Sequence, residues 1–156
     1  MARPLASGQL EYPGAPEVPH AWAYLPDLGR LCEALGTREA DLPRLVEMPY
    51  PGLTLSGQTL ADLCGAALDR PVRLRQMAWW PLRLATPVWP LARHLIEMRY
   101  LWSMPHRLDP APLAAFDPQW HQRDAAEAVQ RAVTAALAAQ SRPRTARAVP
   151  PRRRAT

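Results

Sequence analysis

The side chains that could do chemistry are few in this chain, and their spacing argues against several reaction classes. All 19 basic residues are arginine, so no lysine can form a Schiff base, complete a phosphate loop or assist a tyrosine in proton transfer. Cys32 and Cys64 lack the paired spacing of a zinc site, and we expect both to be buried thiols in a reducing compartment. The histidines show no metal-ligand spacing either, lying at positions 20, 94, 106 and 121.

The positions of the glycines and serines argue against further kinds of functional site. The seven glycines never form the G-x-G-x-x-G spacing of a dinucleotide site or a phosphate loop, where backbone amides must approach the phosphates closely. No serine stands in a G-x-S-x-G nucleophile elbow. The sequence thus predicts no catalytic residue, no cofactor-binding residue and no metal ligand in this chain.

Positive charge is concentrated at the C-terminal end. Residues 141–156 hold six arginines and no acid, which leaves 13 arginines against 14 acidic residues in the remainder. This Arg/Pro-rich tail has no apolar periodicity, so we predict that it is disordered. It would attract anions without sequence preference, and no specific nucleic-acid partner is expected.

Membrane and export signals are missing from the sequence. The longest apolar region, residues 77–102, is interrupted by prolines and charged residues, so no transmembrane segment is predicted. Residues 1–8 do not contain the apolar core of a secretory signal. We therefore expect a cytoplasmic location.

Three short strands are expected in the body of the chain. Residues 1–19 are rich in proline and form a loop-rich lead-in with one strand-like piece at 9–12. Strands are predicted at 20–25, 45–50 and 72–75, where large apolar residues alternate or form short runs closed by proline.

About five helices are expected between and after these strands. Asp27, Ser56 and Asp124 stand where helix N-caps belong, because their side chains can accept the free amide groups of a first helical turn. A further helix is predicted over 88–102, whose apolar stripe comprises Val88, Leu91, Leu95, Met98 and Trp102.

One segment carries a resemblance to a known family. The run HAWAYLPDLG at 20–29 is preceded by Tyr-Pro-Gly at 12–14 and followed by MPYPGLTLSG at 48–57. Together these resemble the second half of extended short-chain dehydrogenases/reductases, the NAD-dependent epimerase/dehydratase family. In that family an aromatic-x-aromatic-x-x-Asp segment ends a strand and begins a helix. The resemblance covers residues 8–138, and 77–84 and 97–102 resemble substrate-side helices of an atypical branch.

The resemblance implies an α/β fold: the C-terminal part of a Rossmann-like NAD(P)-binding fold with a helical substrate lobe over residues 20–140. Complete members use NAD(P), held at a glycine-rich turn, and a Tyr-x-x-x-Lys pair that moves a proton during hydride transfer. This chain has neither. It would therefore be a partial oxidoreductase or epimerase, inactive alone. Either a partner chain carries the missing dinucleotide-binding half, or the chain is a truncated gene product.

The same resemblance implies a substrate site formed by His20, Trp22, Arg99 and Trp102. Members acting on nucleotide sugars place an arginine where His20 stands, so the substrate would be a small molecule other than a nucleotide sugar. Structural roles remain open for these residues. His20 could simply be hydrogen-bonded, and the tryptophans could be core residues.

A rival function comes from another class. The Trp-rich helical region and the arginine tail would also suit a non-enzymatic interaction protein, whose apolar face binds a partner while the tail adds electrostatic attraction.

Overall fold

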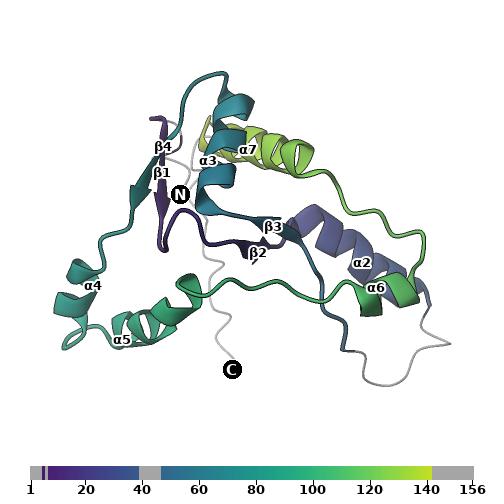
Figure 1. Cartoon of the computed structure of the whole chain (residues 1–156), viewed down its shortest axis with the longest axis horizontal. Coiled ribbons are helices and arrows are strands. Elements are labelled where there is room, and N and C mark those ends of the chain that lie inside the picture. The colour runs from purple at the N-terminus through teal and green to yellow at the C-terminus, as the bar shows by residue number, and fades with distance from the viewer. Residues whose placement is uncertain (1–4, 6, 39–46, 142–156) are drawn as a thin grey trace, which may run out of the picture.

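The protein is described here by a computed structural model, which covers residues 5, 7–38 and 47–141, with side chains to residue 139. The predicted mixed α/β class is confirmed, with four strands and six α-helices among the described residues instead of three and about five. In chain order (Figure 1) the elements are β1 (Gln9–Tyr12), β2 (His20–Trp22), α2 (Leu25–Thr37), β3 (Leu53–Leu55), α3 (Gly57–Leu68), β4 (Arg73–Gln76), α4 (Trp80–Ala85), α5 (Pro90–Glu97), the 3-10 helix η2 (Met98–Trp102), α6 (Ala111–Phe116) and α7 (Ala125–Ser141).

The strands form two separate pairs in the described part of the chain. β1 and β4 run parallel, with Gln9 opposite Arg73 and Tyr12 opposite Gln76. β2 and β3 run antiparallel, with His20 opposite Leu55. Parallel strands need a long crossover, and here the connection from β1 to β4 includes the other pair and α3. β1 lies within the predicted lead-in, where its Tyr12 is 1% exposed.

Two apolar clusters hold the elements together. The larger lies between α3, β3 and α7, which crosses and packs against α3 (Figure 1), and its buried members are Leu5, Leu55, Cys64, Val129 and Val133. The smaller joins α2 to α6 through Leu31, Tyr50 and Leu113. β2 and β3 cross the middle of the molecule between these clusters (Figure 1).

Two of the three predicted caps are confirmed. The Ser56 hydroxyl accepts the Thr59 amide at 3.1 Å, and the Asp124 carboxylate accepts the Ala126 amide at 2.9 Å. The prediction for Asp27 was wrong. α2 begins two residues earlier, its N-cap is Tyr24 without a side-chain bond, and Asp27 is buried inside the first turn.

The prediction of a strand over 45–50 is also wrong within the residues that the structure describes. Residues 45 and 46 lie outside the described residues, and 47–50 form no strand. Pro49 and Pro51 lack the amide donors of a ladder, and Met48 and Tyr50 pack against Leu31 instead. The strand begins after the Pro51–Gly52 turn, as β3.

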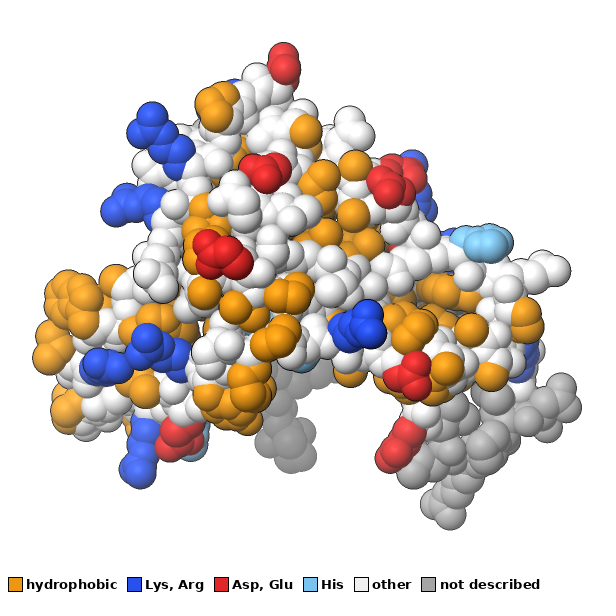
Figure 2. Space-filling model, in the orientation of Figure 1, with side chains coloured by type: hydrophobic (Ala, Val, Ile, Leu, Met, Phe, Trp, Pro, Cys, Tyr) orange, Lys and Arg blue, Asp and Glu red, His pale blue; other side chains and the backbone are white. Residues whose placement is uncertain are grey.

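The helix predicted over 88–102 is broken. α5 ends at Glu97 and the chain tightens into η2, with α4 as a separate short helix. The predicted apolar stripe is largely exposed: Val88 is 85% exposed and Met98 is 53% exposed, whereas the buried residue of α5 is Ala92. Figure 2 shows hydrophobic side chains gathered over the α4 and α5 end of the molecule.

One expectation about buried residues needs correction. Cys64 is buried in the larger cluster, but Cys32 is exposed on α2. Trp22, Trp79 and Trp102 are half-buried, whereas Trp80 is 64% exposed and Trp89 is 45% exposed. The predicted disordered tail lies outside the described residues except for Ser141, which ends α7.

Candidate functional site

His20 begins β2 and is 2% exposed. Its Nε2 lies 3.2 Å from the carbonyl oxygen of Leu101, and its Nδ1 lies 2.8 Å from the hydroxyl of Tyr12. A carbonyl oxygen can only accept, so Nε2 carries the proton, and Nδ1 accepts from the Tyr12 hydroxyl. Both nitrogens of the imidazole are thereby occupied. In this arrangement it orients its neighbours and is not free to act as a base.

Aromatic rings surround this imidazole. The ring centroid of Trp102 lies 5.2 Å from that of His20 and 6.1 Å from that of Trp22. Tyr12 meets Trp102 edge-on at 5.8 Å, a favourable geometry for aromatic pairs. Burial raises the pKa of Tyr12 above its usual value of 10.0, which keeps the phenol protonated as the donor to His20.

A cavity of about 210 Å³ opens beside these rings. Its walls are mostly apolar, and both nitrogens of His20 are already bonded, so the exposed side chain of His106 is the polar group best placed to contact a ligand. The cavity therefore suits a small apolar or aromatic molecule with one polar group at its rim. It is lined by His20, Ala21, Trp22, Met98, Leu101, Trp102 and His106.

Three of the four predicted site residues meet at this cavity: His20, Trp22 and Trp102. Arg99 does not line it. Its side chain is exposed, and its guanidinium carbon lies 5.6 Å from the centre of the Trp79 ring, so it packs on the neighbouring segment.

Five contributors to the site were missed from the sequence, one of them Ala21, which lies between His20 and Trp22 in β2. Tyr12 belongs to the Tyr-Pro-Gly segment of the resemblance and could have been found there. Met98 was expected only as part of an apolar stripe. Leu101 contributes through its carbonyl oxygen, which any residue type could supply, and His106 follows a loop with no periodic pattern.

Close backbone packing and a side-chain bond hold the two tryptophans in place. A Cβ at Gly14 would lie 2.4 Å from the Trp102 carbonyl oxygen, so only glycine lets the segment after β1 approach η2 this closely. The indole nitrogen of Trp22 donates to the Leu55 carbonyl at 3.2 Å, across the β2–β3 pair. Both rings are therefore fixed by groups distant in sequence.

The aspartate of the aromatic-x-aromatic-x-x-Asp segment has a structural role. Asp27 is 0% exposed, and its carboxylate accepts Arg30 Nη2 at 3.1 Å and the Arg123 amide at 3.1 Å. It thereby joins α2 to the segment that begins α7. Tyr50 lies close enough that Asp27 adds to the effect of burial in raising its pKa, against a smaller opposite effect of Arg30.

Comparison with known proteins identifies no relative of this chain. No protein-family model, curated protein or solved structure matches the chain.

The described residues include no glycine-rich turn of the kind that holds a dinucleotide. Gly57 stands at the strand-to-helix turn between β3 and α3. A Cβ at Gly57 would lie 2.8 Å from the Tyr12 ring, so this glycine allows α3 to pack closely on β1. Within the described ranges, no three His, Cys, Asp or Glu side chains converge to hold a metal ion.

None of the described helices has the length and apolar content to cross a bilayer.

Proposed function

We propose that this chain is the substrate-binding side of an NAD(P)-dependent oxidoreductase or epimerase that resembles the extended short-chain dehydrogenase family. The observation that carries the proposal is the aromatic cavity beside β2, where His20, Trp22 and Trp102 meet. The substrate is a small, largely apolar molecule. Because no arginine of the described ranges lines this cavity, none of those residues would bind the phosphates of a nucleotide sugar there.

The isolated β1–β4 pair supports the proposal that a dinucleotide-binding half completes this sheet. Parallel strands normally lie inside larger sheets covered on both faces, and an isolated pair has little stability of its own. In β4, Arg73, Arg75 and Gln76 are exposed, and Leu74 is only half-buried. A dinucleotide-binding half that continued this pair would complete the fold and supply the glycine-rich turn and the Tyr/Lys pair. Alone, the chain is inactive, and we place it in the cytoplasm.

Two experiments test the proposal. Toluene titrated into the full chain should perturb the fluorescence of Trp22 and Trp102, and Ala21→Leu, which fills the cavity, should abolish this response. Ala126→Leu, on the exposed face of α7, is the matched control. An unchanged response in Ala21→Leu would contradict the cavity as a binding site.

The second experiment reads the coding DNA upstream of Met1 in all three frames. A strand, a glycine-rich turn and a later Tyr-x-x-x-Lys encoded there would support the proposal, and the joined protein should then oxidise or reduce NAD(P). If nothing of the kind is encoded, the oxidoreductase part of the proposal fails.

The exposed apolar side chains of α4, α5 and η2 favour a second candidate, a non-enzymatic interaction protein. Residues 73–107, which include these elements, hold six arginines and one acid, Glu97. Such a protein would bind RNA, DNA or anionic vesicles in a salt-dependent way. Loss of that binding on deletion of residues 141–156 would support this candidate, and absence of binding at low salt would remove it.

A further inference from the structure

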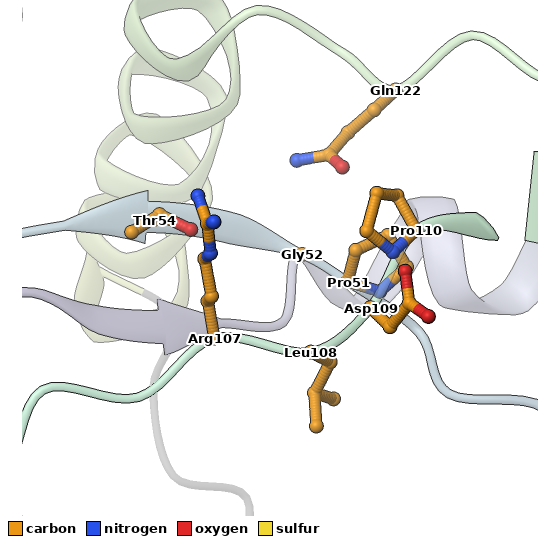
Figure 3. A pocket seen from close by; sticks show the side chains of 8 residues that line it. All are labelled: Pro51, Gly52, Thr54, Arg107, Leu108, Asp109, Pro110 and Gln122. Carbon is orange, nitrogen blue, oxygen red and sulfur yellow. The ribbon is translucent and has the colours of Figure 1, made fainter.

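A second cavity, of about 580 Å³, lies beside β3 and does not share a lining residue with the aromatic cavity. Its lining side chains come from three separate segments (Figure 3): the turn into β3, the loop before α6, and the loop before α7. They are Pro51, Gly52, Thr54, Arg107, Leu108, Asp109, Pro110 and Gln122. We propose that this cavity binds a small organic anion, through a carboxylate or phosphate group held by Arg107.

Three polar side chains converge on the cavity without partners. In Figure 3 the Arg107 side chain extends past Thr54, and the Gln122 amide points toward its guanidinium from the opposite wall. Among the described residues, no hydrogen bond or ion pair engages the side chain of Arg107, Thr54 or Gln122. A guanidinium, a hydroxyl and an amide together offer the donors that an oxyanion needs.

The backbones that carry Thr54 and Arg107 are anchored. Thr54 is the central residue of β3 and lies opposite Ala21 in the antiparallel pair. Arg107 follows His106, whose amide donates to the Pro19 carbonyl at 3.2 Å and fixes the loop beside β2. The two side chains therefore start from defined positions, which reduces the entropy lost when a ligand binds.

Gln122 is fixed from both sides. The carbonyl of His121 accepts Arg30 Nη2 at 3.2 Å, and the amide of Arg123 donates to the Asp27 carboxylate at 3.1 Å. The Asp27 network described above thus also sets one wall of this second cavity.

One acidic group lines the cavity, but it is directed elsewhere. The Asp109 carboxylate accepts the Ala111 amide at 3.0 Å at the start of α6, and Figure 3 shows it pointing away from Arg107. It does not form an ion pair with Arg107, which leaves the guanidinium as the free charge of the site.

Size and wall chemistry set the ligand class. A volume of about 580 Å³ lies within the roughly 300–1,000 Å³ typical of small-molecule sites. Pro51, Pro110 and Leu108 give apolar walls, so the cavity can also hold an uncharged ring or short chain attached to the anion. Arginine pairs equally well with carboxylate and phosphate through two parallel bonds, and the two sources are separated by experiment.

The test is a titration of the full chain with phenyl phosphate, benzoate and benzyl alcohol, followed by amide NMR shifts. Phenyl phosphate or benzoate should shift the amides of Gly52, Thr54 and Leu108 saturably, and whichever binds tighter identifies the preferred head group. Benzyl alcohol, which lacks the charge, should bind at least tenfold more weakly. Equal binding of benzyl alcohol would overturn the proposal.

Matched variants separate a built site from general attraction to a basic protein. Arg107→Gln should weaken the anion at least tenfold, and Thr54→Val, which keeps a strand-compatible shape, should weaken it less. Arg83→Gln removes the same charge from the exposed face of α4 and should change nothing. If Arg83→Gln weakens binding as much as Arg107→Gln does, the proposal fails. Met98→Ala, which alters only the aromatic cavity, should leave anion binding intact, so this result is independent of that cavity.

Discussion

The phenol of Tyr12 donates a 2.8 Å hydrogen bond to Nδ1 of His20, eight positions later in the chain. The two residues are 1% and 2% exposed, so neither polar atom can exchange its partner for water. The bond links β1 of the parallel pair to β2 of the antiparallel pair, and it fixes the orientation of the imidazole that lines the aromatic cavity.

Replacing Tyr12 by phenylalanine leaves Nδ1 of His20 buried without a donor. An unsatisfied buried acceptor costs about 1–3 kcal/mol, so we expect the free energy of unfolding in urea to fall by that amount. Tyr100→Phe is the control, because Tyr100 is 58% exposed and should be near neutral. Equal effects of the two variants would show that the Tyr12–His20 bond contributes nothing.

Two glycines in helices should respond oppositely to alanine. At Gly57 the added Cβ would meet the Tyr12 ring at 2.8 Å, and we expect overpacking to destabilise the fold by about 1–3 kcal/mol. At Gly29, in α2, nothing lies within 4 Å, so alanine should stabilise by roughly 0.5–1 kcal/mol through helix propensity. Thermal unfolding of both variants checks the pair, and a stabilised Gly57→Ala would contradict the packing.

Asp27→Asn removes the charge shared by Arg30 and Arg123. Because the carboxylate is 0% exposed, we expect a loss of about 1–3 kcal/mol in the free energy of unfolding, measured in urea. Glu97→Gln is the control: its ion pair with Arg93 is exposed and should contribute less than about 0.5 kcal/mol. A loss no larger than that of Glu97→Gln would exclude a stabilising role for the Asp27 network.

Acid should weaken the start of α7. The Arg123 guanidinium, bonded at 2.6 Å, lowers the pKa of Glu127 below its usual value of 4.5, and Arg131 at 2.9 Å adds to this. A lowered folded pKa means that the pairing stabilises the fold above about pH 4.5 and that this contribution is lost as the pH falls through the folded pKa.

Glu127→Gln should therefore flatten the acid limb of a stability profile measured by thermal unfolding. A carboxyl titration of Glu127 by NMR gives the same information directly, with a midpoint below 4.5 that rises in Arg123→Ala. An acid limb that is identical in Glu127→Gln would assign the acid sensitivity to other groups.

The two thiols should differ in reactivity. Cys32 is exposed, whereas Cys64 is buried and its burial raises the pKa of its thiol, which disfavours the reactive thiolate. We expect one rapid equivalent of reaction with a disulfide reagent in the native protein and two after unfolding. Cys32→Ser should remove the rapid phase, and a persisting rapid phase would mean that Cys64 is accessible.

Local signals in the sequence predicted the local structure well. The caps Ser56 and Asp124 each satisfy amides within three residues, so nothing distant had to be known. Asp27 has the same side-chain chemistry but was mispredicted, because its decisive partner, the amide of Arg123, lies 96 residues away. Ser56 and Asp124 were predicted correctly because their partners are local, whereas the role of Asp27 depends on a residue distant in sequence.

The aromatic cavity was predicted in part for the same reason. His20 and Trp22 lie in one strand and were identified together, but the bond from His20 to the Leu101 carbonyl spans 81 residues. The apolar stripe through Val88 was misread as a buried face because periodicity shows that a face is apolar and not that anything covers it. Arg107 has no sequence signal at all, since it stands in an irregular loop.

The parallel pairing of β1 with β4 also sets the order in which this chain can fold during synthesis. The Arg73 amide bonds the Gly8 carbonyl, and the Trp79 indole reaches the Pro13 carbonyl across 66 residues. Among the described strands, β1 is synthesised first but pairs with the last, and such distant contacts form slowly. Until they do, the Tyr12 side chain of β1 is open to chaperones and proteases, so the lifetime of the nascent chain depends on the synthesis of β4.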